Sequence, residues 1–148
     1  MAMALLDTNV LVHAIDRLSP LHAPAARLVE LGLGERGRFC ISPQNLVEFS
    51  AVVTRPRLVR APLPGDELER MTGILYRSRR LKKIYPMRGT VMRSIREGAA
   101  LGISGPAWYD LYLALTMRDA GVEIVVTEDL GHFRRFPFVT ALRIKDAI

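Results

Sequence analysis

The sequence has little cysteine, little lysine and no long hydrophobic run. Cys40 is the only cysteine among 148 residues, which excludes an intrachain disulfide and a cysteine-based zinc site. The longest uncharged run, residues 98–109, is shorter than the roughly 18 residues that a membrane-spanning helix needs. The basic segment of a signal peptide is also missing from the start of the sequence. We therefore expect a cytoplasmic protein with no membrane anchor.

The composition is that of one basic globular domain, which we expect to span residues 1–148. Hydrophobic residues make up 49% of the chain, which excludes a disordered protein. The formal net charge is +6, and 18 of the 21 basic residues are arginine. Arginine binds phosphate groups in a bidentate manner, so nucleic acid is one interpretation of this excess. The other interpretation is a genome whose composition favours arginine.

Short apolar runs alternate with helical patterns along the chain. This alternation predicts a three-layer α/β/α domain with a central, mainly parallel sheet. A polar turn is expected at residues 7–9, directly after the first strand. The expected strands are 4–6, 38–41 and 123–127, with weaker signals at 82–85 and 142–145. The expected helices are 23–33, 42–54, 66–81, 90–101 and 107–120.

One glycine motif is misleading. Residues 32–37 match the spacing GxGxxG, but they follow a predicted helix and precede a predicted strand. The dinucleotide-binding motif needs the opposite order, a strand followed by a helix. We therefore interpret these glycines as the end of a helix and a loop, which weakens the hypothesis of a nucleotide-binding domain.

Two acids lie within apolar helical patterns. Asp110 has no lysine or arginine three or four residues away, and a buried carboxylate without a partner is costly. It either caps a helix that begins one residue later or faces a cation. Glu48 shares its helical face with Gln44, Asn45 and Arg55, so a loose pair with Arg55 is the alternative to a functional role.

Two further acids follow predicted strands. Asp7 comes directly after the first strand, and Asp129 follows the strand at 123–127. Ligands bind beyond the carboxyl ends of parallel strands, although either acid alone is more typical of a turn or a helix cap. If these acids meet Glu48 and Asp110, the four carboxylates suit Mg²⁺ or Mn²⁺, which act on phosphates.

Four segments of the chain resemble the motifs of PIN-domain nucleases, and among them the VapC-type toxins of toxin–antitoxin pairs. In chain order they are Leu5–Val12, Ser42–Phe49 with Thr54–Pro56, Tyr109–Ala114, and Val126–Asp129 with Phe133. Each segment is weakly specific, but four in the right order and spacing make a strong signal over the whole chain.

The resemblance implies an endoribonuclease that depends on Mg²⁺ or Mn²⁺ and in which metal-activated water attacks an RNA phosphodiester. Asp7 and Asp110 would be the most direct metal ligands, Glu48 would bind metal or orient the water, and Asp129 would complete the site. Glu128 adjoins Asp129, and family position favours Asp129. The polar residues Thr8, Asn9 and Thr127 would support the carboxylates.

The resemblance also implies partners. Family members usually form homodimers and are inhibited by a small antitoxin, whose tail lies in an apolar groove and places a basic side chain near the acids. The helices at 42–54 and 66–81 carry candidate residues for this groove. Arginines would attract the RNA backbone around the acids, and the candidates are Arg55, Arg57, Arg79 and Arg80.

Two other functions are compatible with parts of the pattern. A phosphatase with Asp7 as its nucleophile would usually need a second aspartate two residues later, where this chain has Asn9. A PIN-like module that binds RNA or a protein without catalysis is the other alternative. The intact set of four acids argues against it.

Overall fold

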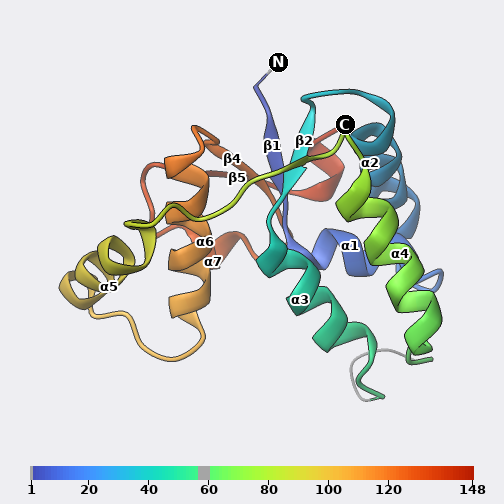
Figure 1. Ribbon diagram of the computed structural model, residues 1–148, viewed down its shortest axis with the longest axis horizontal. Coiled ribbons are helices and arrows are strands. Elements are labelled where there is room, and N and C mark those ends of the chain that lie inside the picture. The colour runs from blue at the N-terminus through green and yellow to red at the C-terminus, as the bar shows by residue number, and fades with distance from the viewer. Residues whose placement is uncertain (1, 57–60) are drawn as a thin grey trace.

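One parallel sheet forms the centre of the molecule (Figure 1). The computed structural model describes residues 2–56 and 61–148. Within them the strand order is β3-β2-β1-β4-β5, and every neighbouring pair is parallel. The strands are β1 (Ala4–Leu6), β2 (Phe39–Ile41), β3 (Lys82–Lys83), β4 (Ile124–Val126) and β5 (Thr140–Leu142). The prediction of a mainly parallel sheet is confirmed.

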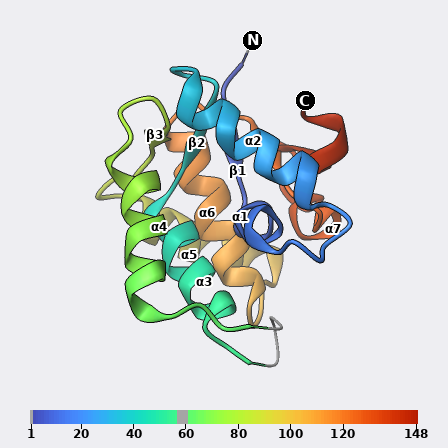
Figure 2. The same ribbon diagram turned by 90° about the vertical axis from the view of Figure 1, so that its right-hand side faces the viewer.

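Helices cover both faces of this sheet (Figure 2), which confirms the predicted three layers. They are α1 (Thr8–Ile15), α2 (His22–Gly34), α3 (Pro43–Val53), α4 (Gly65–Arg77), α5 (Thr90–Leu101), α6 (Ala107–Asp119) and α7 (Leu130–Phe133), followed by a short 3₁₀ helix, Ile144–Asp146. The GxGxxG-like glycines lie at the end of α2 and in the loop before β2, as expected. No helix in the described residues is long and apolar enough to cross a membrane.

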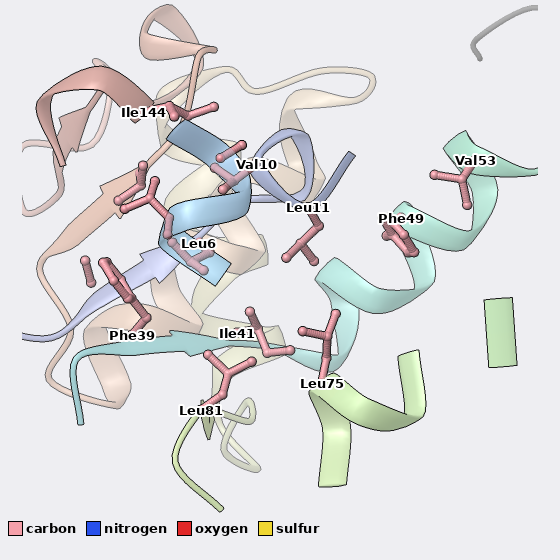
Figure 3. Close-up of a cluster of buried hydrophobic side chains, with 14 residues drawn as sticks. Leu6, Val10, Leu11, Phe39, Ile41, Phe49, Val53, Leu75, Leu81 and Ile144 are labelled. Carbon is pink, nitrogen blue, oxygen red and sulfur yellow. The ribbon is translucent and has the colours of Figure 1, made fainter. Parts of the chain in front are cut away.

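The alternation of side chains along β1 divides the core into two clusters. Leu6 packs with residues of α1, α3 and α4, such as Leu11 and Phe49 (Figure 3). Leu5, which points to the other face, packs with Leu111 and Leu115 of α6. Successive residues of a strand point to opposite faces, so the fully buried strand must be apolar at every position.

The strand order reverses direction at β1. The chain runs outward from β1 through β2 to β3, and then returns to the other side of β1 to form β4 and β5. The carboxyl ends of β1 and β4 are therefore adjacent at a topological switch point, where open α/β sheets bind ligands. Asp7 follows β1 at this point, and Thr127 follows β4.

The sequence prediction was wrong at the start of the chain, where residues 7–9 do not form a turn. Helix α1 begins at Thr8, and the Asp7 carboxylate caps it by accepting a hydrogen bond from the Thr8 N–H at 2.8 Å. Val10 and Leu11 are buried against the core, and this burial stabilises a helix that is only eight residues long.

Two predicted boundaries also differ. Helix α4 ends at Arg77 rather than residue 81, because the Ser78 hydroxyl accepts hydrogen bonds from the Arg80 and Leu81 N–H groups and turns the chain. The last strand is Thr140–Leu142 rather than 142–145, because only those three residues pair with β4. Ile144, in the 3₁₀ helix that follows, is fully buried in the first core cluster.

Helices α5 and α6 pack closely at Gly98. A Cβ atom on Gly98 would lie 2.6 Å from Cη2 of Trp108 and 2.7 Å from Cδ2 of Leu111, which are both on α6. Since α6 also carries Asp110, this contact sets the position of a candidate site residue.

Gly98→Ala is expected to destabilise the protein by about 1–3 kcal/mol, because the added methyl group overpacks the α5–α6 contact. The measurement is the free energy of unfolding in urea. Gly34→Ala is the matched control, since Gly34 is also helical and has no atom within 4 Å of the added Cβ. Equal stability of the two variants would contradict the close packing at Gly98.

Candidate active site

All four acids identified in the sequence line one cavity of about 480 Å³. Asp7 follows β1, Glu48 lies on α3, Asp110 lies on α6 and Asp129 directly precedes α7. The cavity also contains apolar and histidine side chains. The other lining residues are Thr8, Asn9, Val12, His13, Ala51, Val52, Pro106, Tyr109 and His132.

Asp7 is the most buried of the four acids, with 8% of its surface exposed. Its Oδ1 accepts a hydrogen bond from the Thr8 N–H at 2.8 Å. Its Oδ2 accepts one from the Thr127 hydroxyl at 2.8 Å and a longer one from the Asn9 amide at 3.4 Å. These donors hold the carboxylate in one orientation at the end of β1.

Burial raises the pKa of Asp7 to about 6, from the usual 3.8. The hydrogen bonds from Thr127 and Thr8 oppose this rise, while the nearby carboxylates of Glu48 and Asp110 add to it. Asp7 is therefore ionised at neutral pH at a cost in free energy, and a cation in the cavity would remove that cost.

Glu48 is held by two donors rather than by an arginine. Its Oε2 accepts a hydrogen bond from the Thr8 hydroxyl at 2.9 Å, and its Oε1 accepts one from the Gln44 amide at 2.8 Å. Within the described residues Glu48 has no ion pair with Arg55, so that alternative is wrong.

The hydrogen bonds behind Glu48 form a chain with a fixed direction. The Ser42 N–H donates to Oδ1 of Asn45 at 2.9 Å, which leaves the Asn45 amide NH₂ to donate to the Thr8 hydroxyl at 3.3 Å. The Thr8 hydroxyl must then donate its own proton to Glu48. Asn45 is completely buried, so this chain fixes Thr8 and Glu48 from the protein interior.

Asn9 joins the ends of β1 and β4. Its amide NH₂ donates to the Thr127 hydroxyl at 2.9 Å and to Oδ2 of Asp129 at 3.2 Å. Its Oδ1 accepts from the Glu128 N–H at 3.2 Å. Of the two adjacent acids, Asp129 lines the cavity, whereas Glu128 contributes its backbone to this network.

Asp110 lies in the first turn of α6, which begins at Ala107, so the alternative in which Asp110 caps a later helix is wrong. The carboxylate is half-buried, and Nδ1 of His132 lies 3.5 Å from its Oδ2. Burial raises the pKa of Asp110, and the carboxylates of Glu48 and Asp129 raise it further. His132 and Arg135 act in the opposite direction.

The donor set around the cavity fits a hard divalent cation. The four acids offer only oxygen atoms, which Mg²⁺ and Mn²⁺ prefer to nitrogen or sulfur. In the parts of the chain that the structure describes, no three acidic, histidine or cysteine side chains are placed close enough to hold an ion together. Each carboxylate is instead hydrogen-bonded or paired with a protein donor, so a cation would have to draw them inward.

Comparison with known proteins assigns the fold to a family. Residues 4–139 match the family model of the PIN domain. Ribonuclease VapC24 of Mycobacterium tuberculosis is 32% identical over 138 residues, which cover 92% of each chain. The chain belongs to the PIN-domain family. The resemblance seen in the four sequence motifs is thereby confirmed.

Solved structures agree with this PIN-domain assignment at the level of the fold. A DNA-bound VapBC structure from Salmonella typhimurium has a TM-score of 0.65 and 24% identity, and the match covers 97% of this chain and 99% of that one. A toxin–antitoxin complex from Klebsiella pneumoniae has a TM-score of 0.58 and 17% identity, with 93% and 95% covered.

Several residues in or next to the PIN-domain cavity were not identified as site residues from the sequence. Gln44 and Asn45 lie in the second motif, one helical turn before Glu48, but their hydrogen bonds cannot be read from spacing alone. His13, His132 and Tyr109 line the cavity from three different helices. For Gln44 and Tyr109, the proximity to a suspected acid was the available signal.

The candidate RNA-binding arginines lie in different places. Arg55 is exposed just beyond α3, one turn past cavity residues Ala51 and Val52, whereas Arg57 lies outside the described residues. Arg79 and Arg80 lie before β3, at the amino end of the sheet, opposite the acids. The Arg80 guanidinium also donates to the Gly34 carbonyl at 2.6 Å. The fold therefore brings neither Arg79 nor Arg80 to the cavity.

We expect Asp7→Asn to leave the metal-free protein at least as stable as wild type at pH 7. The folded protein holds the Asp7 proton more tightly than the unfolded chain does, so ionisation of Asp7 lowers stability at pH 7 by roughly 3 kcal/mol. This penalty disappears as the pH falls from about 6 towards 4, and any advantage of the variant should disappear with it.

Thermal unfolding in a chelating buffer between pH 4.5 and pH 7.5 measures this effect. Asp66→Asn is the control, because it makes the same change at an exposed position at the start of α4, outside the cavity. Asp110→Asn should likewise be at least as stable as wild type at pH 7, because burial also raises the pKa of Asp110. If wild type were more stable than Asp7→Asn at pH 7, by a margin that grew with pH, the carboxylates would not repel one another.

Proposed function

We propose that this PIN-domain chain is a metal-dependent endoribonuclease and the toxin of a toxin–antitoxin pair. The observation that carries the proposal is the cavity at the switch point of the sheet, which Asp7, Glu48, Asp110 and Asp129 line together. Support comes from Mycobacterium tuberculosis VapC24, which matches along 92% of this chain and is named a ribonuclease. RNA phosphodiesters are the proposed substrate.

Asp7 and Asp110 would be the most direct ligands of the Mg²⁺ or Mn²⁺ ion, with Glu48 and Asp129 completing the site. A divalent ion in such a site polarises phosphoryl oxygens, lowers the pKa of water and stabilises the leaving oxygen. Repulsion among the acids, together with the burial of Asp7, favours binding of a cation.

The protein's own side chains orient the acids. The Thr127 hydroxyl and the Asn9 amide aim the Asp7 carboxylate and tie it to the end of β4. The Thr8 hydroxyl and the Gln44 amide each occupy one oxygen of Glu48. Each carboxylate oxygen has a second lone pair, so Glu48 still has the capacity to orient the attacking water.

The hydrogen bonds of Asn9 argue against the phosphatase alternative. A second aspartate at this position would be needed as an acid, but Asn9 donates hydrogen bonds to Asp7 and Asp129. An ionised aspartate could not donate these bonds and would add a fifth negative charge to the cavity. This arrangement favours phosphodiester hydrolysis without a covalent aspartyl intermediate.

The proposed antitoxin would inhibit the enzyme by placing its tail in an apolar groove. A second, apolar hollow of about 200 Å³ lies between α1, α2, α3 and α4, the last two of which carry the predicted groove residues. The fold resembles a protein solved as a toxin–antitoxin complex from Klebsiella pneumoniae, which supports such a partner. The homodimer expected from the resemblance stays a prediction.

Asp110→Asn and Asp7→Asn are each expected to lower Mg²⁺- or Mn²⁺-dependent RNA cleavage at least about a hundredfold while the protein stays folded. Each substitution removes a charge that would hold the ion and leaves the side-chain volume unchanged. Single-turnover cleavage of a labelled RNA, with circular dichroism as the test of folding, measures the effect. Asp66→Asn is the control and should cleave normally. Cleavage at the wild-type rate by folded Asp110→Asn would overturn the proposal.

A further inference from the structure

The cavity has a second part that the acids do not explain. Five of its lining residues are apolar or aromatic: Val12, Ala51, Val52, Pro106 and Tyr109. None of the five is buried, and Tyr109 is 65% exposed. Apolar surface beside a cluster of carboxylates does not help to bind a cation, so it indicates contact with another part of a ligand.

These five residues form the apolar wall of the cavity. The spacing along the helices places this wall next to the polar groups. Val12 is four residues after Thr8 on α1, and Val52 is four residues after Glu48 on α3. Pro106 is four residues before Asp110. Residues four apart share a helix face, about 6 Å along the axis, so each apolar residue lies about one turn from a polar group of the site.

The direction of two helices shows on which side of the acids the wall lies. Helix α3 leads away from the sheet edge, whereas α6 returns towards it (Figure 1). Val52 and Pro106 are therefore both farther from the sheet than Glu48 and Asp110. A ligand held by the acids would extend outward along this wall.

The backbone of Tyr109 is held by hydrogen bonds on both sides, whereas its ring is exposed. Its N–H donates to the Pro106 carbonyl at 3.0 Å, and its own carbonyl accepts from the Gln44 amide, also at 3.0 Å. Gln44 also binds Glu48, so a single side chain links the acid on α3 to the backbone of Tyr109. A tyrosine with a fixed backbone loses little conformational entropy when it binds a flat ligand.

We propose that Val12, Ala51, Val52, Pro106 and Tyr109 form a base subsite, which binds one unpaired nucleobase of the RNA by stacking on Tyr109. This inference rests on the proposed function, since a phosphodiester at the acids brings a base with it, one sugar away. Single-stranded RNA is bound by stacking of bases on aromatic side chains, whereas bases inside a duplex are not accessible to such a wall. The substrate would therefore be unpaired at the cleavage site.

The test measures binding rather than cleavage. A set of single-stranded oligoribonucleotides, each with one abasic position, is titrated into Asp110→Asn with and without Tyr109→Ala, and affinity is read by fluorescence anisotropy. With Tyr109 present, one abasic position should weaken binding about tenfold. With Tyr109→Ala, intact RNA should bind about tenfold more weakly, and that abasic position should have no further effect.

Two variants separate stacking from other effects. Tyr109→Phe keeps the ring and should bind like the tyrosine. Tyr85→Ala removes another exposed tyrosine, 51% exposed and outside the cavity, and should leave the abasic profile unchanged. The base subsite would be refuted if no abasic position depended on Tyr109, or if the losses of affinity from the abasic position and from Tyr109→Ala were additive. The apolar wall would then suit a side chain of a protein partner. Cleavage by Asp110→Asn would refute the proposed function alone.

Discussion

The constraint on which this structure depends is the presence of ionised carboxylates in a partly buried cavity. Asp7 is almost completely buried, and Glu48 and Asp110 raise the cost of its charge. The free energy of that charge is lowered by donors from the backbone and from Thr127. The surrounding structure therefore brings these acids to one cavity and orients them with hydrogen-bond donors, an arrangement that favours the binding of a cation.

The fold supplies these donors because its strands are parallel and its chain reverses direction at β1. The ends of β1 and β4 are adjacent, so Asn9 can bridge residues that lie 120 positions apart in the sequence. Helices α3 and α6 approach the same edge from opposite faces of the sheet and are linked by Gln44. The close contact of α5 with α6 at Gly98 fixes the second of these helices. The proposed base subsite uses residues of these helices and of α1 that line the same cavity as the acids.

Much of the fold could be predicted from the sequence, because buried parallel strands must be apolar at every position and the helices alternate with them. Helix α1 could not, since eight residues carry a weak periodic signal and its stability comes from the burial of Val10 and Leu11. Asp110 and Glu48 were identifiable as charges within apolar helical patterns, and Asp7 and Asp129 by their places after predicted strands. Three of their donors, Thr8, Asn9 and Thr127, were expected only from the family resemblance. The bonds from Gln44 to Tyr109 and from Asn45 to Thr8, and the pairing of His132 with Asp110, could not be predicted, because each joins separate elements.

Direct titration with Mn²⁺, followed by the electron paramagnetic resonance signal of the free ion, tests whether the carboxylates form one cation site. One ion per chain should bind at pH 7.5, with an affinity that falls as the pH drops below about 6, where Asp7 binds a proton. Asp110→Asn should bind the ion much more weakly at every pH. Binding that is equally tight in wild type and Asp110→Asn, or that does not change between pH 7.5 and pH 5, would show that the carboxylates do not form one cation site.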